Sequence, residues 1–340
     1  MTQKHFVIIG NGAAGNRAAD VLREGDSHAK ITIISDEFFH FYYRHRLKDF
    51  IVGNIDETSL TVRSSEYYHD KHIRLRLGQQ VIKIDLNSQL LYLKHMELVR
   101  YTHLLLCTGG KPRMPEIHYR YREHFTSMIT LDDAKHMKQQ LPAVKRMIVV
   151  GGDLISVQIT KRLLNAGIEV VFLVDRDAFW PLTFSDVIEK DFNRALRRAG
   201  AKIISDDAIV NIEKLGHMAY QVRTRSGENL ECNLVGGFFG LVPQVDFLVG
   251  SGLDIDRGIL VDEHLKTHFD NVYAAGDCAQ VYNPQLSNYW VSIGWGNAVK
   301  LGEIAAHNML GSPDTAIRPP INVLDYEGIE VKTEWWQEVS

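Results

Sequence analysis

The start of the chain alternates between short apolar runs and a stretch of mixed character. An apolar run at 6–9 leads into a turn of small residues at 10–15, and a stretch with helical spacing follows at 17–23. A second apolar run occupies 31–34. Short apolar runs bounded by glycine are typical of buried strands, whereas a period near 3.6 residues indicates a helix. The segment therefore predicts a strand, a tight turn, a helix and a second strand.

The same order of elements returns once. An apolar run at 147–150 precedes a small-residue turn at 151–156, a helical stretch at 158–165 and another apolar run at 169–174. A strand, glycine turn, helix and strand open a Rossmann unit, and two such units separated by insertions indicate two domains of one design. We expect an α/β fold with two Rossmann-like dinucleotide-binding domains and a short C-terminal tail.

The first turn has the glycine spacing of a dinucleotide site. Gly10 permits the tight turn, Gly12 lets a pyrophosphate approach the backbone, and Gly15 lets helix and strand pack closely. The helix that begins near Ala13 and Ala14 then offers free N–H groups and a positive dipole end to the phosphates.

An acidic residue is also expected after the second strand. Dinucleotide sites place one about 20 residues beyond the glycines, where it binds a ribose hydroxyl. Asp36 and Glu37 both lie there. Because the strands, glycines, helix and acid all occur in order, the pattern favours dinucleotide binding over a structural turn.

Five further segments resemble motifs of the FAD-dependent pyridine-nucleotide oxidoreductases, in the order in which that family carries them. They are a tyrosine–arginine segment at 42–47, a strand at 78–85, a threonine–glycine segment at 104–113, a glycine–aspartate segment at 272–279 and a helix start at 295–298. The resemblance extends over almost the whole chain and implies FAD as the cofactor.

The resemblance also implies individual contacts with FAD. Asp277 would bind the ribityl chain, the backbone of Val81 would hold the adenine, and the helix with Trp295 and Ala298 would abut the flavin ring. The other residues implied in cofactor binding are Arg44, Thr108, Gly109 and Gly276.

The three cysteines indicate a branch of this family that does not use thiols. Disulfide reductases of the family carry a CxxxxC pair on the first helix, and related peroxidases carry one cysteine after the second strand. Residues 38–50 contain no cysteine, and Cys107, Cys232 and Cys278 lie elsewhere. A thiol mechanism needs a thiolate in an activating site. The chain therefore resembles the rubredoxin and ferredoxin reductases and the flavin domain of nitrite reductases, in which flavin serves an outside redox partner.

The second glycine motif departs from the family pattern. The family has glycine at three positions and a glutamate soon after, but here those positions hold Gly151, Asp153, Ser156 and Gln158. A side chain at the middle position obstructs the pyrophosphate, and the Asp153 carboxylate repels it. Two readings remain open: the NAD(P)H site is lost, or the loop shifts and leaves a weak, usable site. Asp175 or Asp177 would bind a ribose in the latter case.

The motif positions suggest how the chain divides. We expect an FAD-binding domain from residues 1–112 and 258–310, an NAD(P)-binding-like domain from 113–257, and a tail at 311–340 that is a remnant of the family's interface domain. The tail contains Trp335 and Trp336, which either cap the chain's own core or anchor a partner.

Composition excludes several classes of function. The net charge is −4 and the sequence pI is near 6.4, so no nucleic-acid partner is indicated. No apolar run approaches the roughly 20 residues that span a bilayer, and no signal peptide or metal site is evident. Three cysteines fit a reducing compartment, so we expect a cytoplasmic protein.

Three functional hypotheses follow. The first is an NAD(P)H-dependent reductase of a rubredoxin- or ferredoxin-type protein. The second is an FAD-bearing subunit of a larger redox complex with an iron–sulfur or rubredoxin-like partner, whose NAD(P)H site is weak or lost. The third is an FAD-stabilised scaffold without activity. The altered second motif favours the second hypothesis, while the nearly complete family frame favours the first.

Overall fold

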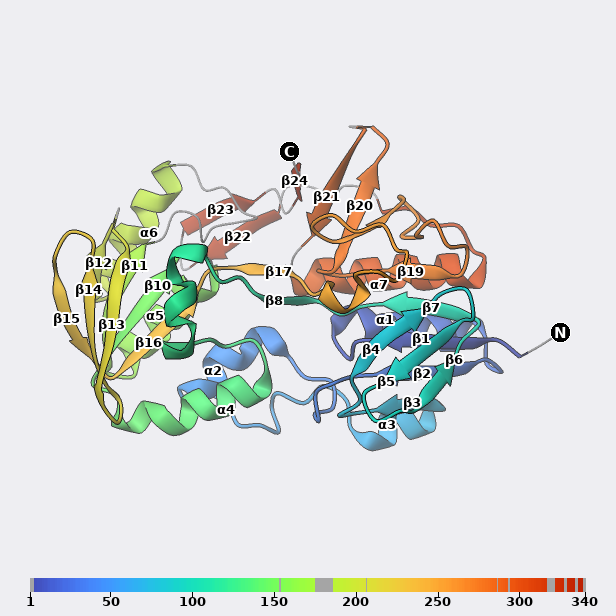
Figure 1. The fold of residues 1–340 in the computed structure, drawn as a ribbon, viewed down its shortest axis with the longest axis horizontal. Helices are drawn as coiled ribbons and strands as arrows, with labels where there is room; N and C mark the ends of the chain where they lie inside the picture. The colour runs from blue at the N-terminus through green and yellow to red at the C-terminus, as the bar shows by residue number, and fades with distance from the viewer. Residues whose placement is uncertain are drawn as a thin grey trace.

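The computed structural model describes residues 3–152, 154–174, 186–205, 207–285, 287–292, 294–316, 322–326, 329–333 and 336–338. The expectations for Asp153, Asp175, Asp177 and Trp335 fall outside these residues, as does the side chain of Trp336. The fold is α/β, and two parallel sheets form its frame (Figure 1). The expected fold class is confirmed.

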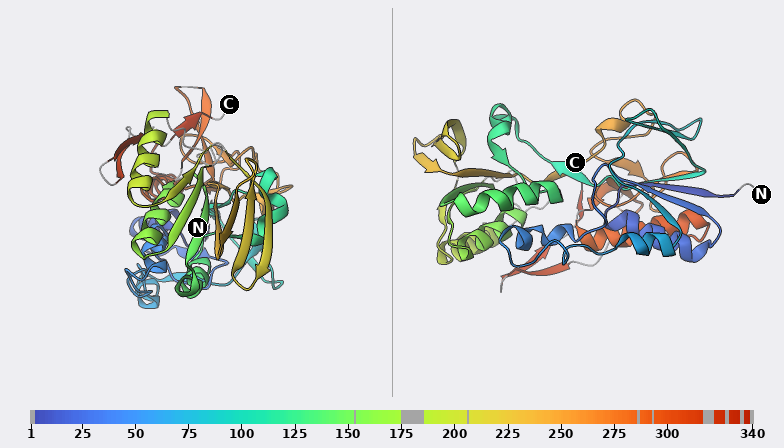
Figure 2. Two further views of the ribbon diagram at one scale, coloured as in Figure 1. Left: turned by 90° about the vertical axis from the view of Figure 1, so that its left-hand side faces the viewer. Right: turned by 90° about the horizontal axis from the view of Figure 1, so that it is seen from below.

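The first sheet has the strand order β19-β7-β1-β2-β3. Its strands are β1 (His5–Ile9), β2 (Lys30–Ile34), β3 (Ile73–Arg76), β7 (His103–Leu106) and β19 (Val272–Ala274). Helices α1 (Ala13–Gly25), α3 (Ser65–Asp70) and α7 (Trp295–Leu310) lie on one face, and the antiparallel strands β4 (Val81–Asp85), β5 (Leu90–Leu93) and β6 (Leu98–Arg100) cover the other (Figure 2). Both faces of the central strand are thereby covered, which explains its continuous apolar run.

The second sheet repeats this plan with the order β12-β11-β10-β16-β9. Its strands are β9 (Phe125–Thr126), β10 (Arg146–Gly151), β11 (Glu169–Val174), β12 (Lys202–Ile204) and β16 (Leu234–Phe238). Its helices are α4 (Leu131–Gln140), α5 (Leu154–Asn165) and α6 (Asp186–Arg198). Antiparallel strands β13 (Ile209–Gly216), β14 (Ala219–Thr224) and β15 (Asn229–Cys232) complete this domain.

Two short strands connect the domains. They are β8 (Gly110–Pro112) and β17 (Leu241–Pro243), which pair antiparallel. After β17, the 3-10 turn Asp246–Leu248 returns the chain to the first domain, where Val245, Leu248 and Leu253 join its core. The chain has therefore re-entered the first domain before residue 258, the boundary expected from the motifs, because these apolar side chains pack on the first core.

A segment of the first domain also packs in the core of the second. After β2, the chain runs through the 3-10 turn Arg44–Arg46 into α2 (Leu47–Ile51). Leu47, Phe50 and Ile51 are buried in the cluster that includes residues of α4 and α5. The range 1–112 is thus not packed as one unit. Two other described 3-10 turns, Glu116–His124 and Leu141–Ala143, belong to the second domain.

The C-terminal segment adds strands to the molecule. A sheet of the first domain contains β18 (Ile259–Val261), β20 (Ala279–Asn283) and β21 (Asn288–Ser292), and β24 (Trp336–Glu338) pairs antiparallel with β21 at its edge. β22 (Asn322–Tyr326) and β23 (Ile329–Thr333) form a hairpin. No helix in the described part of the chain is both long and apolar enough to cross a bilayer.

Candidate functional site

The first glycine turn has two glycines that packing requires and one that faces open space. Gly10 has a φ of +118°, and a Cβ there would lie 2.0 Å from the carbonyl oxygen of Cys107. A Cβ on Gly15 would lie 2.2 Å from the carbonyl oxygen of Gly10. A Cβ on Gly12 would meet nothing within 4 Å. The turn therefore leaves open space next to Gly12, whereas β1 and α1 pack tightly at Gly10 and Gly15.

This space lies at the N-terminus of α1. Gly12 is the N-cap residue, makes no side-chain cap and is followed by no acidic residue in the first turn. The N–H groups of Ala13 and Ala14 and the positive end of the helix dipole are thus available to an anion. The loop has space and backbone donors for a pyrophosphate, and the binding of one here stays a prediction.

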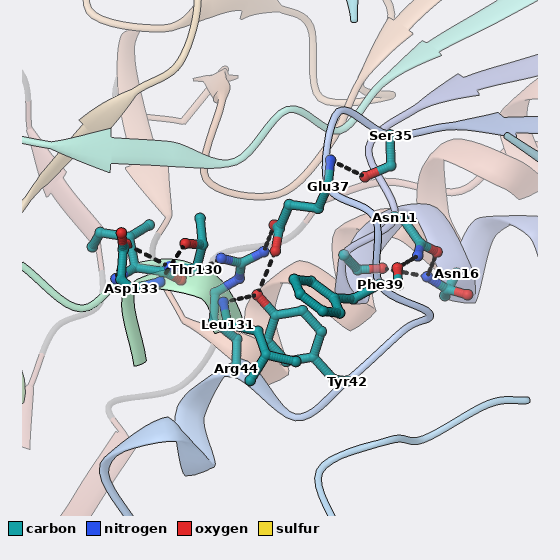
Figure 3. Close-up of polar contacts among 12 residues, drawn as sticks. Asn11, Asn16, Ser35, Glu37, Phe39, Tyr42, Arg44, Thr130, Leu131 and Asp133 are labelled. Carbon is teal, nitrogen blue, oxygen red and sulfur yellow. Dashed lines mark hydrogen bonds and ion pairs between the residues drawn. The ribbon is translucent and has the colours of Figure 1, made fainter. Parts of the chain in front are cut away.

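Two asparagines, which the sequence analysis did not identify, brace the turn (Figure 3). Asn16 is fully buried, and its Nδ2 donates to the Oδ1 of Asn11 at 2.9 Å and to the carbonyl oxygen of Gly12 at 3.0 Å. The Tyr68 hydroxyl donates to Asn16 Oδ1 at 2.7 Å, and Asn11 Nδ2 donates to the Phe39 carbonyl at 3.2 Å. A polar residue on the buried face of an otherwise apolar helix was the available signal, because such a group needs partners.

The two acids after β2 have different surroundings. The Glu37 carboxylate accepts a hydrogen bond from the Tyr42 hydroxyl at 2.7 Å and pairs with the Arg44 guanidinium (Figure 3). Tyr42 in turn accepts from the backbone N–H of Leu131 at 3.1 Å, at the start of α4. Asp36 is exposed, and its carboxylate has no hydrogen-bond partner among the described residues. Asp36 is thus the acid of the two that is available to a ligand.

Arg44 connects both domains through this cluster. Besides Glu37, it donates to the backbone carbonyl of Ile129, which precedes α4. Its positive charge also acts on Asp277. Arg44 thus contacts Glu37 and Ile129 and acts electrostatically on Asp277, and its role in cofactor binding stays a prediction.

Asp277 lies directly beyond β19, beside the start of α7. Its Oδ1 accepts a hydrogen bond from the backbone N–H of Gly294, the N-cap of α7, at 3.3 Å. Burial raises the pKa of Asp277 to about 6, although this hydrogen bond and Arg44 lower it. The carboxylate can therefore accept hydrogen bonds near neutral pH. Across from it, a Cβ on Gly276 would come within 3.2 Å of Ala14 and 3.6 Å of Ala298, so α1 and α7 meet closely here.

Aromatic side chains surround the first residue of α7. The Trp295 ring stacks on Phe41 with ring centroids 5.3 Å apart and an interplanar angle of 7°. Tyr43 and His45 lie against Trp295 with centroid distances of 5.5 Å and 5.0 Å. Burial lowers the pKa of His45, and Lys48 and Arg46 add to this effect. The cluster presents flat apolar surface next to Asp277, which suits a planar ring system.

The remaining predicted contacts have structural partners. Val81 is buried at the start of β4. Thr108 Oγ1 donates to the Gln244 carbonyl at 2.8 Å, and the Gln244 N–H donates to the Gly109 carbonyl at 2.9 Å. Thr108 and Gly109 thus hold the chain where it returns from the second domain.

All three cysteines are buried, and burial disfavours the thiolate form of each. Burial raises the pKa of Cys107 and of Cys278, and it raises the pKa of Cys232 to about 12. Cys107 packs against Gly10 of the first glycine turn, and Cys278 Sγ donates to the Leu106 carbonyl at 3.3 Å. A nucleophilic thiol needs a lowered pKa, so none of the three is activated.

The second glycine turn keeps part of the same geometry. A Cβ on Gly151 would lie 2.2 Å from the carbonyl oxygen of Phe238, as Gly10 does with Cys107. α5 begins at Leu154, three residues after Gly151, just as α1 begins three residues after Gly10. Ser156 takes the place of Gly15 and is fully buried, so its side chain enters the contact between helix and strand. Gln158 is half-buried on α5.

An ion pair joins α2 and α5 at Arg162, further along α5 than the second glycine turn. Arg162 Nε lies 2.7 Å from Asp49 Oδ1, and Arg162 Nη1 donates to the Gln158 carbonyl at 3.3 Å. Burial lowers the pKa of neighbouring Lys48, as does the charge of Arg162. Charged groups of α2 and α5 thus meet where these two helices pack together.

The family model, the similar sequences and the similar solved structure are all of oxidoreductases. Residues 4–296 match the family model described as pyridine nucleotide-disulphide oxidoreductase. Rhodocoxin reductase of Rhodococcus erythropolis is 29% identical over 283 residues, which cover 81% of this chain and 64% of that protein. The 3-phenylpropionate/cinnamic acid dioxygenase ferredoxin–NAD(+) reductase component of Photorhabdus laumondii is 27% identical over 333 residues, covering 98% and 84%. Among solved structures, the covalent putidaredoxin reductase–putidaredoxin complex superimposes with a TM-score of 0.85 at 25% identity, covering 93% of this chain and 78% of that chain.

Proposed function

Because the chain belongs to the pyridine nucleotide-disulphide oxidoreductase family, we propose that it passes electrons between a noncovalently held FAD and a separate redox protein. The chain is an FAD-dependent oxidoreductase, as predicted. We further propose that it works without a thiol, in the cytoplasm, and that its NAD(P)H site is weak or lost.

This proposal rests on the burial and the raised pKa values of the cysteines. All three are buried and their pKa values are raised, so the chain offers no internal thiolate to take electrons from the flavin. An acceptor outside the chain is then required. The names of the relatives support a small iron–sulfur or rubredoxin-like protein, since they include reductases of ferredoxin and rubredoxin.

The first glycine site fits FAD. We assign the pyrophosphate to the space above Gly12 at the N-terminus of α1, the ribose hydroxyls to Asp36, and the ribityl hydroxyls to Asp277. Trp295 and Ala298 would line the ring at the start of α7. When bound, FAD can exchange two electrons with one reactant and pass single electrons to another.

Three residues of the second glycine motif indicate a weaker NAD(P)H site. Ser156 is a buried side chain at the position where the first turn has Gly15, which opposes the close approach of helix and strand that glycine allows. Gln158 lacks the charge of the family's glutamate. Asp153 adds a negative charge near the expected pyrophosphate.

A second candidate function is an active NAD(P)H-dependent rubredoxin- or ferredoxin-type reductase. Gly151 and the start of α5 keep the geometry of the first turn, and the second parallel sheet is built like the first. The word NAD(+) in the names of several relatives supports the same alternative.

Anaerobic mixing of the protein with a nicotinamide nucleotide distinguishes the two candidate functions. Holoenzyme is mixed with NADH or NADPH, and the flavin absorbance near 450 nm is followed. Our proposal predicts slow or absent bleaching with micromolar nucleotide, followed by bleaching with dithionite. Rapid bleaching with micromolar NADH would establish the reductase alternative. Absence of flavin from the purified and reconstituted protein would overturn both.

A further inference from the structure

Arg63, which lies just before α3, contacts both α1 and α3. Its guanidinium pairs with the Asp20 carboxylate of α1, and the two side chains are 13% and 12% exposed. The Tyr67 hydroxyl of α3 donates to the same carboxylate at 2.6 Å. A guanidinium has five N–H donors in a fixed fork, so one ion pair uses only part of it. The other donors of Arg63 can therefore hold a second group.

That second group is Asn16, which braces the first glycine turn. Arg63 Nη1 donates to Asn16 Oδ1 at 3.1 Å and to the Asn16 carbonyl at 3.2 Å. Asn16 Oδ1 also accepts from the Tyr68 hydroxyl at 2.7 Å. Because two donors meet at Oδ1, the amide nitrogen of Asn16 must face the other way, toward the Gly12 carbonyl and Asn11 Oδ1 (Figure 3). Arg63 thus fixes the orientation of the Asn16 amide.

The orientation of this amide bears on the backbone donors of the turn. The Gly12 carbonyl accepts from Asn16 Nδ2 and from the Asn16 backbone N–H, both at 3.0 Å. In a planar trans peptide the C=O and the following N–H point in opposite directions. With its carbonyl held at two points, the Gly12–Ala13 peptide keeps the Ala13 N–H directed out of the N-terminus of α1.

Arg63 also contacts the aromatic side chains at the proposed flavin position. Its guanidinium lies over the Phe41 ring at 5.5 Å, and its backbone N–H donates to the Phe41 carbonyl at 3.4 Å. Phe41 in turn stacks on Trp295 at the start of α7. One residue therefore touches the brace of the glycine turn and the ring that backs Trp295.

We propose that Arg63 is a positioning residue for FAD, which holds the phosphate-binding turn through Asn16 and the aromatic wall through Phe41. A site that is already held in its binding geometry loses less conformational freedom when the ligand binds. This inference rests on the proposed binding of FAD and adds the residue that sets the two ends of the site relative to each other.

The test measures release of FAD from the holoenzyme of Arg63→Gln. The matched control is Arg23→Gln at the other end of α1, where Arg23 donates to the carbonyls of Lys71 and His72, both at 2.9 Å, just beyond α3. FAD that passes a filter after dilution gives the rate of release. Visible circular dichroism of the bound flavin reports how the ring is held, and thermal unfolding gives the Tm.

We expect both glutamine variants to lower the Tm, because each removes hydrogen bonds of a charged group. FAD release should accelerate about tenfold or more in Arg63→Gln and less than about twofold in Arg23→Gln. The circular dichroism of the flavin that remains bound should change only in Arg63→Gln. Equal acceleration in the two variants would overturn the positioning role and leave FAD binding intact.

Arg63→Lys separates stability from positioning and carries the test where Arg63→Gln does not fold. It keeps the charge that pairs with Asp20, so it should recover most of the Tm. A single ammonium group lacks the fork that reaches Asp20 and Asn16 together, so fast FAD release should remain. Full recovery of FAD retention in Arg63→Lys would overturn the proposal.

A double-mutant cycle tests whether Arg63 acts through Asn16. Asn16→Ala/Arg63→Gln should accelerate FAD release by less than the product of the two single effects, because both substitutions disturb the same hydrogen bonds. Fully multiplicative effects would contradict this route. Absence of FAD from the wild type would overturn the proposed function and this inference with it.

Discussion

At the scale of single residues, the site depends on which groups already have partners. Gly10 and Gly15 are closed by backbone oxygens, whereas Gly12 faces open space. Glu37 is held by Tyr42 and Arg44, whereas Asp36 is exposed and available. Substitutions at these neighbouring positions should therefore have different effects on FAD binding and on folding.

Gly12→Asp should abolish FAD retention while leaving the fold intact. Gly12 has a φ of −91°, which any residue adopts, and its Cβ would meet no atom within 4 Å. Two like charges about 4 Å apart at an effective dielectric of 20 cost about 4 kcal/mol, or about three powers of ten in affinity. The flavin-to-protein ratio and far-UV circular dichroism measure both effects. Gly12→Ala is the control that adds a side chain without charge. Full flavin content in Gly12→Asp would show that the turn does not hold the pyrophosphate.

Asp36→Asn and Glu37→Gln should separate ligand binding from domain packing. Asp36→Asn should weaken FAD affinity about five- to tenfold and leave the Tm of the apoprotein unchanged, because the carboxylate has no partner in the described structure. Glu37→Gln should lower the apoprotein Tm, because it removes the charge that pairs with Arg44. FAD titration and thermal unfolding give the two readouts. The reverse assignment of effects would refute the choice of Asp36.

His5 should make stability depend on pH. Burial, with help from Lys30 and Arg74, lowers the pKa of His5 from 6.5 to about 4. Between these values the unfolded chain binds a proton that the folded protein does not, so stability is fully present above pH 6.5 and decreases as the pH falls toward 4. Thermal unfolding from pH 7 to 4.5 should show a smaller decrease in Tm for His5→Gln, which can still bond with Thr32. Parallel curves for the two proteins would exclude His5.

At the scale of elements, the local sequence pattern was sufficient for the two Rossmann units. The runs that precede Gly10 and Gly151 form β1 and β10, and α1 and α5 begin where the turns end. These features depend on neighbouring residues. The choice between Asp36 and Glu37 could not be made from the sequence, because the N–H of Leu131 that orients Tyr42 lies 89 residues away.

Restoring the second glycine turn should create or strengthen flavin reduction by NADH. Asp153→Gly removes a side chain and a charge, Ser156→Gly lets α5 approach β10, and Gln158→Glu restores the family residue. We expect a gain of about tenfold or more in apparent affinity, about 1.4 kcal/mol, mostly from Asp153→Gly. Stopped-flow reduction of the triple variant and wild type measures it. Ready reduction of the wild type by micromolar NADH would show that the site was never impaired.

At the scale of the whole molecule, the two domains share packing that no local pattern encodes. α2 follows the first Rossmann unit in sequence, but Leu47, Phe50 and Ile51 are buried with the second domain. Asp49 adds an ion pair with Arg162 of α5. The predicted boundary near residue 258 also rests on local motifs alone, whereas Val245, Leu248 and Leu253 pack in the first core across a long sequence separation. Such contacts depend on the tertiary fold and not on periodicity.

The shared core also bears on how electrons leave the molecule. Leu47, Phe50 and Ile51 pack in the core of the second domain, and Asp49 of the same helix pairs with Arg162, so these contacts oppose a large rotation of one domain against the other. This agrees with our proposal that a separate protein, and not an internal thiol, accepts the electrons.

The most direct test is electron transfer to a protein acceptor from the reduced flavin of a variant of this chain in which the three cysteines are replaced. The wild type and a Cys107→Ala/Cys232→Ala/Cys278→Ala variant are photoreduced without nucleotide and mixed anaerobically with oxidised [2Fe–2S] ferredoxin or rubredoxin. The account predicts reoxidation of the flavin, matched by acceptor reduction, at rates that agree within about twofold because the buried thiols take no part. Loss of transfer in the folded, flavin-loaded variant, or failure of the wild type to reduce either acceptor, would contradict it.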